Sequence, residues 1–286
     1  MSFIKGGLVF ADRITTVSPQ YALEIQDKKF GYGLEGLLRH RRSQLTGILN
    51  GIDDKVWNPA IDPLIEANYD LGLMQNKLLN KHYLQNYYGL EQSNQLLLGF
   101  IGRLVEQKGI DLIIKLIPSL KQLSAQLVIL GSGERTFETQ LKQLAKRHSD
   151  VFRVQIGYDE VLAHKIEAGI DAFLMPSKFE PCGLNQMYSL RYGSIPIVTN
   201  VGGLSDSVVD VSDKSLKSNT ATGFILDEPN SAEFLKTINR VVALYKKPKQ
   251  WASLVKTGMS RRFDWRTSAQ QYLKLYQSLL NKTTSV

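Results

Sequence analysis

The residues best suited to chemistry stand in three short segments, each just after an apolar run and just before a helical pattern. Arg103 and Lys108 lie on the first of these turns, and Glu180 opens the second. The third begins with the pair Gly202-Gly203. Two cations and glycine-led helix starts suit phosphate groups, and a single carboxylate suits the hydroxyl groups of a sugar. The spacing therefore predicts a pocket for a sugar that carries a diphosphate.

The elements that must position these residues alternate between strand and helix. Apolar runs predict strands at 96–101, 127–130, 152–156, 172–175 and 195–198, and helical spacing predicts helices at 110–123, 137–147, 161–168, 186–192, 204–209, 231–244 and 267–280, with a break at 246–248. Continuous apolar strands between amphipathic helices are typical of a parallel sheet covered on both faces. We therefore expect a doubly wound α/β fold, in which ligands bind at the carboxyl ends of the strands.

The chain is expected to divide into four parts. Residues 1–53 contain a strand at 14–17 and a helix that starts at Ser18-Pro19, too little to bury their own apolar faces, so we interpret them as the remnant of an N-terminal domain. Residues 54–95 are a polar connection, 96–262 form the nucleotide-sugar domain, and 263–286 form a helix that crosses back. Apolar residues of both flanks should be left partly exposed; they include Ile14, Val17, Tyr272 and Leu275.

Composition and charge exclude several classes of function. The 286 residues carry a net charge of +8, which suits nucleic acid, a membrane surface or a phosphorylated ligand. No basic stripe is interleaved with aromatic residues, so nucleic acid is not expected. No apolar run is long enough for a membrane span, and no signal peptide pattern opens the chain. A single cysteine, Cys182, fits a reducing compartment and hence the cytoplasm.

Four motifs, taken in order, carry a resemblance to a known family. They are Ile48-Leu49-Asn50-Gly51-Ile52-Asp53, then Gly102-Arg103-Leu104 with Gln107-Lys108-Gly109, then the run from Phe179 to Gln186, and last Gly202-Gly203-Leu204. Together they resemble bacterial glycogen synthase and plant starch synthase, retaining glucosyltransferases with the GT-B fold of two Rossmann-like domains facing across a cleft. The resemblance runs from residue 3 to residue 280. It implies that the chain holds the end of the family's first domain and all of its second, most of the N-terminal domain being missing.

The resemblance also implies a role for each motif. Arg103 and Lys108 match the pair that holds the donor's diphosphate and stabilises the leaving nucleotide, and Glu180 matches the residue that contacts the glucosyl unit. Tyr158 matches a tyrosine near the nucleotide base, although its neighbour Asp159 replaces the histidine of better-known relatives. Asn50 matches a position at the edge of the sugar cleft. The remaining positions expected in the site are Cys182, Gly183, Leu184, Gly202, Gly203 and Leu204.

The implied reaction is transfer of glucose from ADP-glucose to the non-reducing end of an α-1,4-glucan, with retention and release of ADP. One carboxylate has no partner for a double displacement, so a same-face attack assisted by the leaving phosphate fits better. No other cofactor and no metal is expected, because no ligand cluster has metal spacing. Two alternatives stay open: a non-catalytic nucleotide-binding fragment, and another GT-B transferase, against which Tyr188 counts because sucrose- or trehalose-forming enzymes carry a second Glu there.

Three tempting motifs have plainer interpretations. Lys5-Gly6-Gly7-Leu8 looks like the family's donor loop, but it lacks one residue, so we interpret it as part of a helix. Gly131-Ser132-Gly133-Glu134 lacks the third glycine of a dinucleotide fingerprint, and we interpret it as a turn. Cys182 has no histidine near it in the sequence, so a packing thiol is favoured over a nucleophile.

Overall fold

The computed structural model describes residues 2–283 of the chain, with side chains described for residues 2–280. The strands are β1 (Ile14–Thr16), β2 (Leu45–Gly47), β3 (Leu96–Leu104), β4 (Ala125–Gly133), β5 (Phe152–Ile156), β6 (Ala172–Met175), β7 (Ile195–Thr199) and β8 (Phe224–Leu226). The helices are α1 (Phe3–Phe10), α2 (Pro19–Glu24), α3 (Glu35–His40), α4 (Gln75–Tyr87), α5 (Ile110–Leu116), α6 (Arg135–Arg147), α7 (Glu160–Gly169), α8 (Asn185–Arg191), α9 (Gly202–Ser207), α10 (Asp213–Lys217), α11 (Ser231–Tyr245), α12 (Pro248–Met259) and α13 (Trp265–Thr283), with short 3₁₀ helices at Glu106–Lys108 and Ile117–Ser119.

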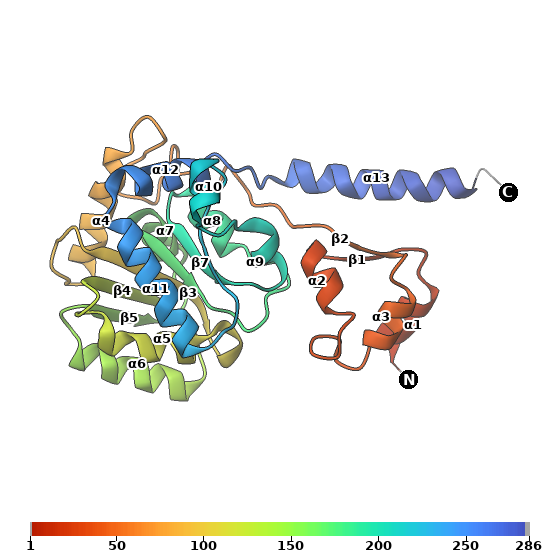
Figure 1. Cartoon of the computed structure of the whole chain (residues 1–286), viewed down its shortest axis with the longest axis horizontal. Helices are drawn as coiled ribbons and strands as arrows, with labels where there is room; N and C mark the ends of the chain where they lie inside the picture. Colours follow the sequence, from red (N-terminus) through yellow and green to blue (C-terminus); the bar gives the residue numbers. More distant parts are fainter. Residues whose placement is uncertain (1, 284–286) are drawn as a thin grey trace.

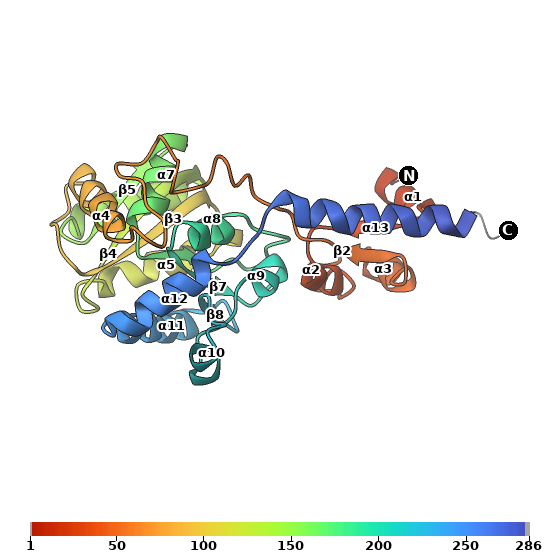
Figure 2. The same ribbon diagram turned by 90° about the horizontal axis from the view of Figure 1, so that it is seen from above.

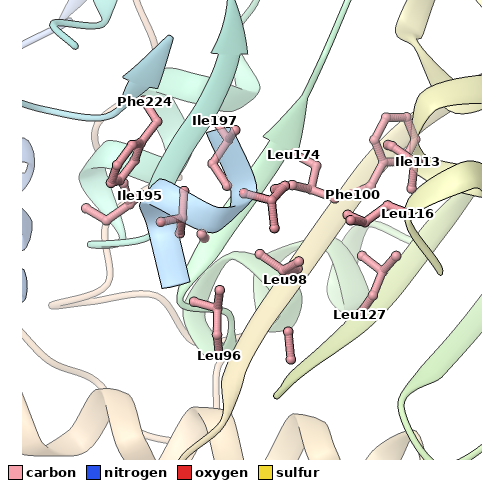
Figure 3. Close-up of a cluster of buried hydrophobic side chains, with 14 of the residues drawn as sticks. Leu96, Leu98, Phe100, Ile113, Leu116, Leu127, Leu174, Ile195, Ile197 and Phe224 are labelled. Carbon is pink, nitrogen blue, oxygen red and sulfur yellow. The ribbon is translucent and has the colours of Figure 1, made fainter. Parts of the chain in front are cut away.

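A parallel sheet in the order β5-β4-β3-β6-β7-β8 forms the centre of the larger body (Figure 1). Successive side chains of a strand point to opposite faces, and β3 shows the consequence. Leu96 and Leu98 belong to the apolar cluster on the face covered by α5 and α11, whereas Leu97 belongs to the cluster on the face covered by α4 and α7. Figure 3 shows the first cluster reaching from Leu127 across the sheet to Phe224. The expected doubly wound parallel sheet is confirmed.

The strand order reverses beside β3. Strands β4 and β5 extend the sheet to one side of β3, and β6, β7 and β8 extend it to the other. The connections from β3 and β6 therefore lead to strands on opposite sides of this point, and doubly wound sheets bind their ligands in a crevice at such a point. Arg103 lies at the end of β3, and Glu180 lies in the loop that follows β6.

Two helices differ from the sequence-based expectation because of proline. The helix expected at 110–123 ends at Leu116 and continues as a 3₁₀ helix that contains Pro118, whose ring nitrogen cannot donate a hydrogen bond. Pro248 was expected only to break the chain, yet it occupies the first turn of α12, where that missing donor costs nothing. Helix α10 and strand β8 were not expected.

The glycine run 131–134 is another difference. We expected a turn there, but β4 continues to Gly133 and only Glu134 lies outside it, at the start of α6. The two strands approach so closely here that only glycine fits at position 131, since a Cβ atom there would lie 2.0 Å from the carbonyl oxygen of Gly102 on β3. Close approach of two strands explains this glycine without a ligand.

Residues 2–50 form a small unit at one side of the sheet domain, which it contacts through α2 and α9, with α13 extending on the same side (Figures 1 and 2). The Lys5-Gly6-Gly7-Leu8 motif lies in α1, so its interpretation as a helix is confirmed. Ile14 is buried, and its expected exposure is wrong because β1 pairs with β2. Val17, Tyr272 and Leu275 are partly exposed as expected. The last three positions of the segment 263–286 lie outside the described residues.

Residues 54–95, expected as a polar connection, pack closely on the sheet domain. Helix α4 lies against α7. Asp62 accepts hydrogen bonds from the hydroxyl of Tyr192 at 2.6 Å and pairs with Nδ1 of His164 at 2.7 Å, all three being buried. The indole of Trp57 is stacked between the rings of His164 and Tyr188, with centroid distances of 3.8 and 3.9 Å. Among the helices within residues 2–283, none combines the length and the apolar character needed to cross a membrane.

Glu167 makes the stability of this packing depend on pH. It is buried on α7, where the Ser189 hydroxyl donates to its Oε2 at 2.8 Å. Burial raises the pKa of Glu167 from 4.5 to about 8. Between these two values the folded state keeps a proton that the unfolded state has released, so the free energy of unfolding falls as pH rises, by up to about 1.4 kcal/mol per pH unit.

We therefore expect Glu167→Gln to flatten the fall in unfolding free energy between pH 5 and pH 7. This window stays below the pKa of Lys77, which burial lowers to about 7 and which changes stability in the opposite direction above that value. Urea unfolding at the two pH values measures the effect, with Glu91→Gln at an exposed site as the control. An equal fall in wild type and Glu167→Gln would contradict the prediction.

Candidate functional site

The turn after β3 brings its two cations against the loop after β6. Gly109 ends the turn with φ at +70°, and a Cβ atom there would lie 2.1 Å from the carbonyl oxygen of Pro176. The Lys178 N–H donates to the carbonyl of Gln107 at 2.8 Å, and the Gln107 side chain donates to the carbonyl of Phe179 at 3.2 Å. Glycine and these bonds hold the two loops together.

Lys108 and Glu180 form an ion pair across the two loops. The Ser177 hydroxyl donates to Oε2 of Glu180 at 3.2 Å, and Glu180 is only 7% exposed. Arg103 is exposed beside this pair, and its guanidinium donates to the Gln107 side chain at 3.0 Å. Lys178 of the same loop is engaged by Glu106 and Asp111. Arg103, which forms no ion pair among the described residues, is therefore the cation most open to an anionic ligand.

The pair Gly202-Gly203 lies against the backbone of the Glu180 loop. A Cβ atom at Gly202 would lie 1.9 Å from the carbonyl oxygen of Glu180, and one at Gly203 would lie 2.1 Å from that of Cys182. The Gly203 N–H donates to the carbonyl of Glu180 at 3.2 Å, whereas the Gly202 N–H donates to Glu24 of the N-terminal unit at 2.8 Å. Loop packing alone thus requires both glycines.

Cys182 packs in an apolar cluster with Ile52 and Met187. Burial raises the pKa of its thiol, and a backbone hydrogen bond from Asn50 only partly opposes this effect. A buried thiol with a raised pKa is a poor nucleophile, so the side chain fits the packing interpretation. The same contact places Asn50 beside the Glu180 loop.

The other predicted site residues differ in burial and in their position on the sheet domain. Gly183 adopts a φ of +70° and packs on Leu204, a fully buried residue of α9. Leu184 is partly buried against the Cys182 cluster. Tyr158 follows β5, two strands from β3, and its side chain is 81% exposed. Tyr158 therefore follows a different strand end from the ion pair.

Sequence reasoning missed residues that support the site from behind. Ser177 contacts Glu180 directly, and the Asn185 side chain donates to the carbonyl of Ile101 at 2.8 Å, tying the start of α8 to β3. Ser177 stands two residues after β6, so its place at a strand end could have identified it. Asn185 carries no such signal, because its partner is a backbone carbonyl in a distant strand.

Comparison with known proteins extends this picture. The family "Glycosyl transferases group 1" matches residues 89–256, and "Starch synthase catalytic domain" matches residues 1–40. The chain is 52% identical to glycogen synthase 1 of Methylococcus capsulatus over 98% of its own length, and 51% identical to glycogen synthase 2 of Nitrosococcus oceani over 100%. It spans only 57% and 58% of those two relatives.

A solved structure is similar over nearly the whole chain. The catalytic domain of starch synthase IV from Arabidopsis thaliana, bound to ADP and acarbose, has a TM-score of 0.91 and 40% identity, covering 96% of this chain and 57% of that one. This similarity confirms the expected fold class. Together with the match over residues 89–256, it leads to one conclusion: the chain belongs to the group 1 glycosyl transferases.

Proposed function

We propose that the chain carries the nucleotide-sugar side of a glycogen or starch synthase, which transfers glucose from ADP-glucose to the non-reducing end of an α-1,4-glucan with retention. The observation that carries this proposal is the Lys108–Glu180 ion pair at the point where the sheet order reverses. Of a cation and a carboxylate held side by side, the cation can bind the diphosphate and the carboxylate can bind the hydroxyl groups of the sugar. The similarity to glycogen synthases at 51–52% identity supports the same choice.

In this proposal each charged residue has a distinct task. Arg103 and Lys108 bind the diphosphate and stabilise the charge that grows on the departing oxygen. Glu180 contacts the sugar hydroxyls, and Ser177 holds its carboxylate in place. Tyr158, which follows β5, lies near the base, and Asn50 borders the sugar. The acceptor attacks from the face that the phosphate leaves, so no second carboxylate is required.

The remaining parts of the proposal concern ligands and location. We place ADP-glucose as donor and ADP as product because the similar starch synthase IV was solved with ADP. No further cofactor, metal or nucleic acid is part of the reaction, and the cytoplasm is its site. The second candidate is a nucleotide-binding fragment without turnover.

The diphosphate assignment predicts that Arg103→Ala and Lys108→Ala each weaken ADP binding. A hydrogen bond to a charged group contributes about 1.5–3 kcal/mol, so each dissociation constant should rise by about 10- to 100-fold. The test uses calorimetry on a fused enzyme, in which this chain follows the part of the Methylococcus capsulatus relative that it does not match. UDP titrated in parallel tests the choice of base.

The matched control is Lys121→Ala. Lys121 pairs with Asp150 at 3.0 Å on an exposed surface, so its loss should leave ADP binding unchanged. Unchanged affinity in both Arg103→Ala and Lys108→Ala would remove the diphosphate role.

A further inference from the structure

Helices α2 and α9 each supply a carboxylate that completes the start of the other helix. The two helices lie against each other and are neighbours in both views (Figures 1 and 2). Oε1 of Glu24, the last residue of α2, accepts a hydrogen bond from the backbone N–H of Gly202 at 2.8 Å. In the other direction, Oδ2 of Asp206 accepts from the backbone N–H of Gln20 at 2.9 Å and from the Ser18 hydroxyl at 2.6 Å.

This exchange satisfies groups that neither helix can satisfy alone. The first N–H groups of a helix have no partner within it, and a carboxylate beside them is favoured by the helix dipole. Ser18 is fully buried and also accepts the N–H of Tyr21 at 2.9 Å, so it closes α2 while it binds Asp206. Within α2, Oε1 of Glu24 has one other partner, the side-chain amide of Gln20 at 3.2 Å, so the bond from Gly202 is the one that joins it to α9.

The contact reaches the loop that carries Glu180. The Gly202-Gly203 turn rests on the carbonyl oxygens of Glu180 and Cys182, as the close approaches above require. A second contact comes from the same N-terminal unit: the ring of Tyr32 meets that of Phe179, the residue before Glu180, at 6.3 Å and 64°. A shift of α9 would therefore move the support of the Glu180 backbone.

We propose that Glu24 and Asp206 form a latch, the pair of crossed caps between α2 and α9, that positions the Glu180 loop from the N-terminal unit. They are positioning residues: they act through the Gly202-Gly203 turn and touch no reacting atom. The inference rests on the proposed function only for the task of Glu180. The latch itself is a property of the chain without ligand.

The test is amide hydrogen exchange, resolved by residue, on the 286-residue chain without nucleotide. Glu24→Ala should speed exchange at Gly202 and Gly203 by about tenfold or more, since a charged hydrogen bond is lost. Glu24→Gln keeps an accepting oxygen and should restore exchange to within about threefold of wild type. Amides of the central sheet, such as Leu98 and Phe173, should not change, which separates loss of the latch from general unfolding.

The control is Glu35→Ala. Glu35 accepts the Gly33 N–H at 2.9 Å within the same N-terminal unit, so its loss should leave Gly202 and Gly203 unchanged. Asp206→Ala should speed exchange as Glu24→Ala does. The double variant should add little to either, because both substitutions weaken the same contact between α2 and α9.

Three outcomes would overturn the proposal. They are unchanged exchange at Gly203 in Glu24→Ala, faster exchange at Gly202 alone, and equal effects of Glu24→Ala and Glu35→Ala. The second of these would leave a helix cap that positions nothing. Failure of ADP to bind would count against the proposed function and would leave the latch standing, because exchange is measured without nucleotide.

Discussion

Glu180→Gln in the fused enzyme should lower kcat by about 100-fold or more while leaving the dissociation constant of ADP within about threefold of wild type. The carboxylate faces Lys108 and Ser177 at the crevice, and the amide keeps its shape but not its charge. If Glu180 contacts the sugar, its substitution should not change ADP binding, because ADP carries no glucosyl unit. Rates of labelled glucose transfer and ADP calorimetry on the same variant separate the two effects.

The control for this variant is Glu228→Gln, a carboxylate on the exposed surface before α11. It should change neither kcat nor the dissociation constant of ADP. Normal glucan synthesis by Glu180→Gln would show that the sugar assignment is wrong, and a large loss of ADP affinity would place Glu180 on the nucleotide side instead.

The 286-residue chain alone should transfer no measurable glucose from ADP-glucose to glycogen, whereas the fused enzyme should. Holding two reactants in register can contribute about 7–11 kcal/mol to a reaction, and the GT-B arrangement does so between two domains. Among the described residues, the segment 2–50 and helix α13 are the parts that extend beyond the sheet domain on this side (Figure 1). ADP binding by the chain alone should accordingly be weak.

The measurement is incorporation of labelled glucose into glycogen, with the Glu180→Gln fused enzyme as the inactive reference. Light scattering of the same sample matters, because Phe3 and Phe10 are 93% and 87% exposed and favour association. Robust incorporation by the chain alone would mean that residues 2–50 suffice and would reject the two-sided requirement.

Much of the sheet could be predicted because its strands are continuously apolar. The bounds of β5 and β6 are those expected from the sequence. Strand β3 runs three residues past its expected end, through Gly102, because the apolar pattern stops where strands pack by backbone approach and not by side chains. Pro248 illustrates the opposite limit: the same residue ends one helix pattern and opens another, and only the following turn decides which.

The site was predictable only as far as its residues follow strands. Arg103 and Glu180 were expected at strand ends, but their strands are neighbours through a crossover, so the Lys108–Glu180 pair could not be derived from order along the chain. Gly202 was expected to approach a phosphate, and the structure gives it a closer neighbour in the Glu180 carbonyl. The role of Glu24 could not be predicted from the sequence, because its partner Gly202 lies 178 residues away.

The stacked position of Trp57 gives the chain an optical probe of its own. The indole is held between His164 and Tyr188, so its fluorescence depends on whether residues 54–62 stay seated on the sheet domain. The chain has only three tryptophans, and the other two, Trp251 beside Tyr245 and the half-exposed Trp265, lie in α12 and α13. In a variant whose other two tryptophans are replaced by phenylalanine, emission from Trp57 would therefore report, without a label, whether the segment that joins the N-terminal unit to the sheet stays packed on it.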